Sequence, residues 1–371
     1  MKMEADEAGS FDAIHFLLYS SYLKHITHPG AAMSNTQDGG AIPLSVLDLV
    51  PIGAGSSAAE ALGNSVELAR LAERLGYRRY WFAEHHGMPS IASSAPEILI
   101  GHIASATERI RVGSGGIMLQ NHVPLRAAEA FHTLAALHPG RIDLGIGRAP
   151  GTDPVTSSAL RPFDPNNFRE HLGELMGLSR GDLPAEHPYH RVRVVPAGVS
   201  LPPVFLLGSS GASARLAGEL GTGYSFARHF SHTSPVPAIQ AYRSSFHPSA
   251  DFPEPHVILG ASVICADTDE EAQYLAASFD LMWVRITRGE FAPIPTPEEA
   301  LAYPYTPRER AVADSYRSLV VVGGPETVHA ELTRLAAETG SDEVMVTATI
   351  HSHAARMRSY ELLAEAVTLP A

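Results

Sequence analysis

The sequence predicts an α/β protein whose strands close into a (β/α)8 TIM barrel. From Pro43 onward, short β-rich runs alternate with longer amphipathic stretches, the pattern of a parallel sheet built from βα units. When the shortest run is set aside, eight strands remain, which is the number in such a barrel. The chain has 371 residues, 45% hydrophobic and 18% charged, enough apolar material for one large core.

Nine runs qualify as strands by composition and by the turn residues around them. They are Leu44–Val50, Tyr80–Glu84, Ile110–Leu119, Arg141–Gly147, Val204–Gly208, Gly223–Ala227, Val257–Ala266, Leu319–Val322 and Glu343–Thr349. Because Leu319–Val322 is the shortest, we expect it to be an extended segment outside the ring.

The stretches between these runs carry helical signals. In the segment Ser57–Leu75, which Gly76 follows, apolar residues recur at helical spacing. Pro96, Pro124 and Pro325 occupy positions where proline is tolerated, in the first turn of a helix. We therefore expect a helix between most pairs of consecutive strands.

Two regions interrupt the regular alternation. Residues 150–202 are rich in Pro, Asp, Asn and His around one short helical patch, Phe168–Leu178, and Gly289–Tyr305 is rich in Pro. Long irregular connections are typically binding loops, lids or solvated insertions. In a barrel we expect both as insertions at the C-terminal face, where barrel enzymes have their active sites.

The charge balance excludes several classes of function. With 27 basic and 40 acidic side chains, the formal net charge is −13, so the chain lacks the basic face that nucleic acids or anionic membranes require. The single cysteine, Cys265, rules out an intrachain disulfide and a cysteine-ligated metal cluster. No run reaches the ~18 apolar residues of a membrane span. We expect a cytoplasmic protein.

The first forty residues differ from the rest. The apolar run Phe16–Leu23 follows acidic residues and lacks the basic flank of a secretory signal. Residues 31–41 are small and polar, typical of a flexible join. We predict that residues 1–40 are an extension, with Met33 as a candidate natural start, and that residues 41–371 form the barrel domain.

The strongest chemical signal is the strand end Tyr80–Gly87, in which Glu84, His85 and His86 follow an apolar run. Such side chains point into the mouth of a barrel, and histidine changes its protonation near neutral pH. A structural alternative is that Glu84 and His85 satisfy each other beneath a loop. We favour the functional interpretation because two histidines follow the carboxylate.

Two further strand ends suggest a phosphate site. Arg148 is flanked by glycine, and a guanidinium there can bind a phosphate through two hydrogen bonds. The sequence Gly208–Ser213 reads as a loop opening a helix, whose free N–H groups and hydroxyls bind anions. Alternatively, the arginine is a surface residue and the serines only cap the helix. The two segments end consecutive strands, so they could share one phosphate.

A glycine-rich strand and two pairs of histidines are further candidate features. Three glycines in Arg111–Gln120 indicate a bulge, the close passage of a planar ligand, or tight packing against a helix. The histidine pairs His229 with His232 and His351 with His353 lack a third ligand at the spacing of known zinc helix motifs, so we predict no metal site.

Several of these motifs, taken in order, resemble the bacterial luciferase-like flavin-dependent monooxygenases. They are LDLVPIG, YWFAEHHG, VGSGGIMLQNHVPLRAAE, LHPGRIDLGIGRAPG, LLGSSGAS, VGGPETV and HSHAARMRSYELLAE. The similarity runs from Pro43 to about Val367. It implies a homodimeric barrel that binds FMN at its C-terminal mouth, receives reduced flavin from an NAD(P)H-dependent flavin reductase, and oxygenates a small organic substrate with O2 through a C4a-hydroperoxide.

The resemblance also implies roles for individual residues. His85, with Glu84 and His86 beside it, matches the acid or base next to the flavin. The cofactor-binding positions that match are Arg148, Ala149 and Pro150 in one turn, Ser209, Ser210 and Ser213 in the phosphate loop, and Ser114, Gly115 and Gly116 behind the isoalloxazine ring. In this family the segment behind the ring often contains a non-prolyl cis peptide. In the phosphate loop, Ser209 stands where the luciferases have a glutamate.

Three alternatives remain. Relatives with the same barrel use the deazaflavin F420 for hydride transfer, although its larger tail prefers a more basic mouth. A non-catalytic flavin-binding protein is a second possibility, which the histidines at the strand end disfavour. A phosphate-binding isomerase or aldolase without flavin is the third, and the only lysines, Lys2 and Lys24, lie in the extension, which disfavours a lysine aldolase.

Overall fold

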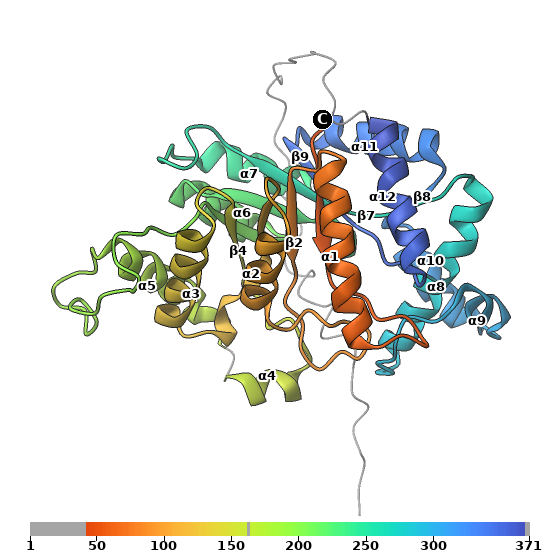
Figure 1. Cartoon of the computed structure of the whole chain (residues 1–371), viewed down its shortest axis with the longest axis horizontal. Coiled ribbons are helices and arrows are strands. Elements are labelled where there is room, and N and C mark those ends of the chain that lie inside the picture. Colours follow the sequence, from red (N-terminus) through yellow and green to blue (C-terminus); the bar gives the residue numbers. More distant parts are fainter. Residues whose placement is uncertain (1–41, 162–163, 368–371) are drawn as a thin grey trace, which may run out of the picture.

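The computed structural model describes residues 42–161 and 164–367 and shows a closed parallel barrel surrounded by helices (Figure 1). Eight strands form the ring in the order β1-β2-β3-β4-β5-β6-β7-β9, and β9 returns to β1. The strands are β1 Leu44–Asp48, β2 Arg79–Phe82, β3 Arg111–Met118, β4 Ile142–Gly147, β5 Val204–Gly208, β6 Gly223–Ala227, β7 Val257–Cys265, β8 Val320–Gly323 and β9 Glu343–Thr347. The predicted (β/α)8 fold is confirmed.

The strand β8 lies outside the ring, as its short length predicted. It pairs only with the second half of β7, from Ser262 to Cys265. Residues 257–260 of β7 pair with β6 and residues 258–262 pair with β9, which closes the barrel. The long strand β7 thus pairs with the strands of the ring along its first part and with β8 along its last part.

Helices separate most of the strands, and their ends follow the local sequence signals. They are α1 Ala58–Arg74, α2 Pro96–Ala106, α3 Pro124–Leu137, α4 Pro154–Leu160, α5 Phe168–Arg180, α6 Gly211–Leu220, α7 Val236–Ser245, α8 Asp269–Thr287, α9 Pro297–Ala302, α10 Pro307–Arg317, α11 Pro325–Thr339 and α12 His353–Val367. At the start of α1, Ser57 and Glu60 form a capping box. The helices α2, α3 and α11 begin at the prolines predicted for a first turn.

The irregular region 150–202 is divided between the two ends of the barrel, so its predicted location is only half right. Its first part follows β4 and contains the unpredicted helix α4, at the bottom of Figure 1. Residues 181–203 instead follow α5, which packs on α3, and lead into the N-terminal end of β5. This second part lies on the side opposite the mouth because α5 runs antiparallel to the strands.

The second irregular region does reach the mouth. Ile294 forms a parallel bridge with Gly53, which follows the C-terminal end of β1. The backbone N–H of Ile294 donates to the Ile52 carbonyl at 2.9 Å. This region also contains the six-residue helix α9, which the Pro-rich sequence did not predict.

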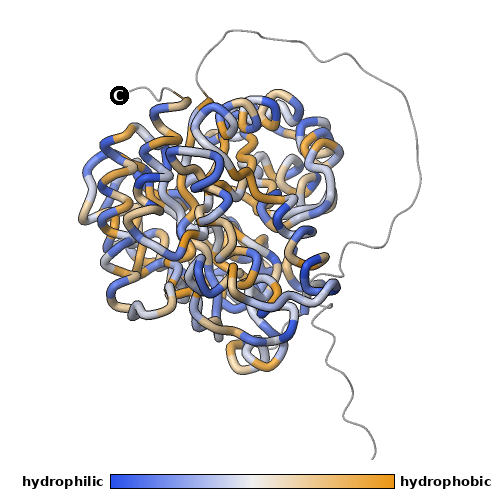
Figure 2. Tube along the Cα trace, turned by 90° about the vertical axis from the view of Figure 1, so that its right-hand side faces the viewer, coloured by the Kyte–Doolittle hydropathy of each residue, from blue (hydrophilic) through white to orange (hydrophobic). Residues whose placement is uncertain are grey.

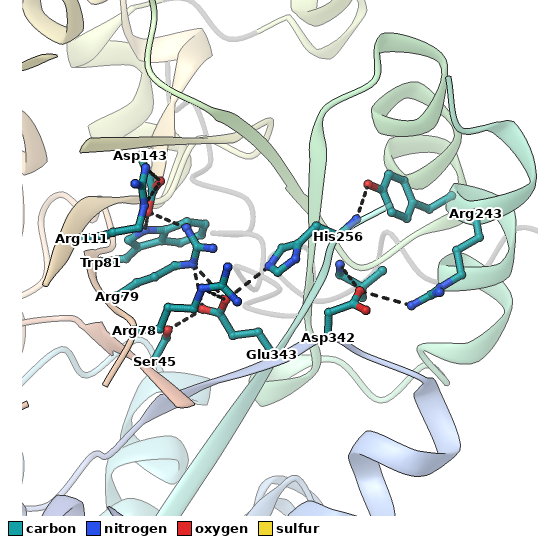
Figure 3. Close-up of polar contacts among 12 residues, drawn as sticks. Ser45, Arg78, Arg79, Trp81, Arg111, Asp143, Arg243, His256, Asp342 and Glu343 are labelled. Carbon is teal, nitrogen blue, oxygen red and sulfur yellow. Dashed lines mark hydrogen bonds and ion pairs between the residues drawn. The ribbon is translucent and has the colours of Figure 1, made fainter. Parts of the chain in front are cut away.

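Ion pairs close the opposite, N-terminal end of the barrel (Figure 3). Two fully buried carboxylates, Glu343 at the start of β9 and Asp143 in β4, are bridged by Arg79 at the start of β2. The Nε and Nη1 atoms of Arg79 lie 2.9 Å from Glu343 and 2.9 Å from Asp143, respectively. The other hydrogen-bond donors to these carboxylates are Ser45, Trp81, Arg111 and His256, and Arg78 forms an ion pair with Glu343 at 3.6 Å.

Most of the remaining interior is apolar, although it also contains buried polar groups such as the ion pair of Asp48 with Arg356. Large side chains such as Trp81, Tyr224 and Phe226 are fully buried, and Figure 2 shows hydrophobic and hydrophilic residues alternating along the surrounding helices. Across residues 42–161 and 164–367, no helix combines the length and hydropathy that a membrane crossing requires. The predicted extension 1–40 and the candidate start Met33 lie outside the described residues.

Candidate active site

The mouth of the barrel gathers the site residues that the sequence predicts. Four neighbouring strands, β2 to β5, pair in parallel, so their C-terminal ends lie side by side. The predicted positions follow or end these strands: Glu84, His85 and His86 after β2, Ser114, Gly115 and Gly116 in β3, Arg148, Ala149 and Pro150 after β4, and Ser209, Ser210 and Ser213 after β5. The fold therefore brings four sequence-distant groups to one edge.

Glu84 is a buried carboxylate whose hydrogen-bonding capacity is filled by the protein. Its Oε1 accepts from His86 Nε2 at 3.0 Å and from Asn121 Nδ2 at 2.9 Å. Its Oε2 accepts from the Met118 N–H at 2.8 Å and from His122 Nε2 at 2.8 Å. Burial by itself would raise the pKa of Glu84, but these donors, His122 foremost, lower the pKa to about 2. Glu84 is thus a fixed anion.

His85 presents a free ring nitrogen. Its Nδ1 lies 3.0 Å from the Gly151 carbonyl oxygen. A carbonyl oxygen only accepts, so Nδ1 carries the proton and Nε2 keeps its lone pair in the neutral ring. Burial holds the pKa of His85 below its ordinary value, which keeps the imidazole neutral near pH 7. The alternative in which Glu84 and His85 satisfy each other is wrong, because Glu84 bonds to His86 and His122.

The ends of β4 and β5 carry groups that can bind an anion. Arg148 is exposed and has no ion pair or hydrogen bond within the described part of the chain. Ser210, the N-cap of α6, is also exposed and makes no side-chain cap hydrogen bond, so the first N–H groups of the helix stay open. Ser213 donates instead to the Ser210 carbonyl at 3.0 Å. These groups fit the phosphate of FMN, because helix N-termini and guanidinium groups both bind phosphate.

The glycine-rich strand β3 contains a cis peptide between Gly115 and Gly116, where the resemblance implied one. Its pairing with β4 shifts register between Ser114 and Ile117, an irregularity consistent with a bulge. The buried Ser114 hydroxyl donates to the Gly145 carbonyl at 2.8 Å, so it is already satisfied by the neighbouring strand. A Cβ atom on Gly116 would lie 2.6 Å from the same carbonyl oxygen, so the close packing is against strand β4 and not against a helix.

The structure adds two polar residues that the sequence did not single out, and it gives His229, considered above only as half of a histidine pair, a position beside another strand end. Asn121 and His122 follow β3 and bond to Glu84. His229, after β6, lies against Gly260 of β7, and its buried Nδ1 has no partner among the described residues. Burial and the nearby His85 lower the pKa of His229 to about 4. His122 was visible within the motif LQNHVP, but no sequence signal paired it with Glu84.

Three of the four histidines in the pairs considered for metal binding have other partners. His351 Nε2 lies 3.0 Å from the Ala54 carbonyl oxygen, and His353 Nε2 lies 3.1 Å from Glu67. The rings of His232 and Tyr316 lie 5.8 Å apart. In the part of the chain that the structure describes, no group of three or more His, Cys, Asp or Glu side chains could hold a metal ion.

Comparison with known proteins identifies the class. The family model described as luciferase-like monooxygenase matches residues 42–343, so the chain belongs to this family. The chain is 44% identical over 324 residues to a luciferase-like monooxygenase of Escherichia coli strain K12, covering 86% of this chain and 96% of the relative. It is 37% identical over 333 residues to N-acetyl-S-alkylcysteine monooxygenase of Bacillus subtilis, covering 88% and 98%. The protein is an oxidoreductase.

Solved structures share the barrel. The crystal structure of apo-MsnO8 is 39% identical, has a TM-score of 0.80, and covers 89% of this chain and 99% of that one. Two more distant structures are similar in fold alone. The oxygenating constituent of 3,6-diketocamphane monooxygenase from Pseudomonas putida, in complex with FMN, has a TM-score of 0.64 at 20% identity, covering 88% and 98%. An F420-dependent secondary alcohol dehydrogenase has a TM-score of 0.65 at 15% identity, covering 88% and 99%.

Proposed function

We propose that this protein is an FMN-dependent monooxygenase that uses reduced flavin and O2 to oxygenate a small organic substrate. The observation that carries the proposal is that Arg148 and the open N-terminus of α6 follow adjacent strands, on the same rim as His85. Membership of the luciferase-like monooxygenase family supports it.

In this proposal some residues bind the flavin and others transfer a proton. Arg148, Ser209, Ser210 and the first amides of α6 hold the phosphate, while the backbone of Ala149, Pro150 and Ser114–Gly116 faces the ring. Reduced FMN, when bound, supplies the chemistry that activates O2. His85 Nε2 takes up or returns one proton during oxygen transfer, because it is the unprotonated nitrogen of a neutral imidazole. Glu84 and His86 support this strand end.

An F420-dependent hydride transfer is the first alternative. The formal net charge of −13 disfavours the binding of a long anionic tail, whereas the exposed guanidinium of Arg148 suits one phosphate. A non-catalytic flavin carrier is the second, and it gives the free Nε2 of His85 no role. Both alternatives predict no substrate-dependent oxygen uptake with FMN.

We propose a flavin reductase as functional partner and a second copy of the chain as structural partner. Exposed apolar side chains on and beside the packed helices α2 and α3 support a subunit interface there: Ile98, Val123 and Leu137 are 68%, 55% and 66% exposed. Sedimentation velocity of the wild type and of a variant with Ile98→Asp measures this interface. A dimer that persists in the variant contradicts its location.

The direct test adds FMN, a flavin reductase and NAD(P)H to the purified protein and measures oxygen uptake and peroxide release. Thioethers are the first substrates to try, because the 37% identical relative is named for an S-alkylcysteine. We expect a true substrate to raise product and to lower peroxide release per NAD(P)H. If titration finds that neither oxidised nor reduced FMN binds at micromolar concentration, the proposed function is wrong.

A further inference from the structure

The carboxylate of Glu84 joins three loops of the mouth. Its four hydrogen bonds come from the loop after β2, through His86, and from the end of β3, through Met118, Asn121 and His122. Each oxygen already accepts two hydrogen bonds, so the group is positioned to fix its neighbours and not to exchange protons with a ligand.

The third loop is held through Asn121. The same Nδ2 that donates to Glu84 also donates to the Pro150 carbonyl at 3.0 Å. The next residue, Gly151, supplies the carbonyl that accepts from His85 Nδ1. Gly151 has φ of 69°, and a Cβ atom there would lie 2.7 Å from the Glu84 carbonyl oxygen, so this turn packs directly on the β2 loop. The group that orients His85 is therefore tied to Glu84.

A buried carboxylate needs a compensating cation. Among the described residues, the ion-pair partners of Glu84 are only His86 and His122, with His122 Nε2 nearer at 2.8 Å. Burial by itself would lower the pKa of His122, but the hydrogen bond to Glu84 and the charges of Glu84 and Glu97 raise it. The guanidinium of Arg161 contacts His122 only at its backbone carbonyl, at 2.6 Å.

We propose that His122 is a positioning residue: as an imidazolium paired with Glu84, it holds the mouth loops so that the Gly151 carbonyl keeps His85 in its Nδ1-protonated form. The inference rests on the proposed function only for the use of the free Nε2 of His85, and the tautomer exists without flavin. Loss of His122 removes the nearer of the two ion-pair partners of Glu84 and leaves Oε2 with one hydrogen bond fewer, beside Asn121 and the β4 loop.

The test is a titration of the flavin-free protein labelled with ¹⁵N-histidine, because imidazole nitrogen shifts distinguish the two neutral tautomers from the cation. Variants with His85→Gln and His122→Gln assign the two rings. In the wild type we expect His122 to remain doubly protonated at pH 7, and His85 to be neutral with its proton on Nδ1. A neutral His122 at pH 7 would overturn the proposal without any further variant.

The effect of the pairing is measured on His85 in variants of His122. In His122→Ala we expect the Nε2-protonated form of His85 to increase about tenfold, the value of one lost hydrogen bond, with the titration midpoint moving toward 6.5. His122→Gln keeps a donor and should retain part of the wild-type tautomer. The exposed His102, changed to Ala, is the matched control.

Amide spectra establish whether each variant is folded. If His122→Ala does not fold, the tautomer and titration midpoint of His85 are measured in His122→Gln. An unchanged His85 tautomer and midpoint in a folded His122 variant contradicts the positioning role. Because no flavin is present, this result is independent of FMN binding. Failure of the proposed function would appear instead as absent flavin binding in the wild type.

Discussion

Replacing Glu343 with glutamine removes the central anion from the network that closes the base of the barrel. Glu343 is fully buried and lies 2.9 Å from Arg79 Nε, with Ser45 and His256 as further partners. Burial by itself would raise the pKa of Glu343, but Arg79 and the hydrogen bonds lower it from 4.5 to about 2. A difference of this size corresponds to about 3 kcal/mol of folding free energy at neutral pH.

We therefore expect Glu343→Gln to lower the unfolding free energy by about 3 kcal/mol at pH 7. This loss agrees with the cost of breaking a buried ion pair. The entropy of unfolding of a domain of this size is roughly 0.7 kcal/mol per kelvin, so Tm should fall by about 4 °C. Urea unfolding and differential scanning calorimetry measure the two quantities, and FMN affinity well below Tm should not change, because the network lies at the end opposite the mouth.

The pH dependence gives this prediction its sign. The folded-state pKa of Glu343 is depressed, so its contribution is fully present above the unfolded value near 4.5 and is lost as pH falls toward 2. The difference between wild type and variant should be constant above about pH 5.5 and shrink below about pH 4.5. Glu338→Gln is the control, because Glu338 pairs with Arg334 on the exposed face of α11 and should cost less than about 1 kcal/mol. A Glu343→Gln variant that melts within about 1 °C of the wild type at pH 7 would refute the reasoning.

Three predictions concern the mouth. Arg148→Ala should weaken the binding of FMN about 10- to 100-fold but that of riboflavin only slightly, because one charge-assisted phosphate contact is lost. Fluorescence titration measures both affinities, with Arg126→Ala as the control. Equal losses of affinity for FMN and riboflavin would contradict the phosphate assignment. His85→Ala should retain FMN but release more peroxide per NAD(P)H, and wild-type coupling would remove the proton-transfer role. Gly151→Ala should lower the unfolding free energy by about 1–3 kcal/mol more than Gly181→Ala, since both have positive φ but only Gly151 is crowded; equal urea midpoints would contradict this.

The barrel strands could be predicted from the sequence because each is an apolar run bounded by turn residues. The helix starts at Pro96, Pro124 and Pro325 were equally readable, since proline has few other places in a helix. The helices α4 and α9 were missed because helices of seven and six residues are too short to show a periodic apolar face.

Some of the site residues could likewise be predicted from the sequence and others could not. Arg148 and Ser210 were accessible to sequence reasoning because a strand end is recognisable locally, and consecutive strands of a barrel lie side by side. The hydrogen bond from His122 to Glu84 and the approach of His229 to His85 were not accessible. They depend on the conformation of the loops and on ring closure, which brings β6 to the side of the barrel opposite β2.

By itself, the sequence determined the alternation of strands and helices, the strand left outside the ring, and the chemical groups that each strand carries to its end. These features depend on local periodicity and on residue type. Only the tertiary structure decided which nitrogen of His85 is free, which residues surround Glu84, and that Ser114 is already bonded to β4. Those features depend on distances of about 3 Å between segments far apart in the chain, and hydrogen bonds exist only within that range.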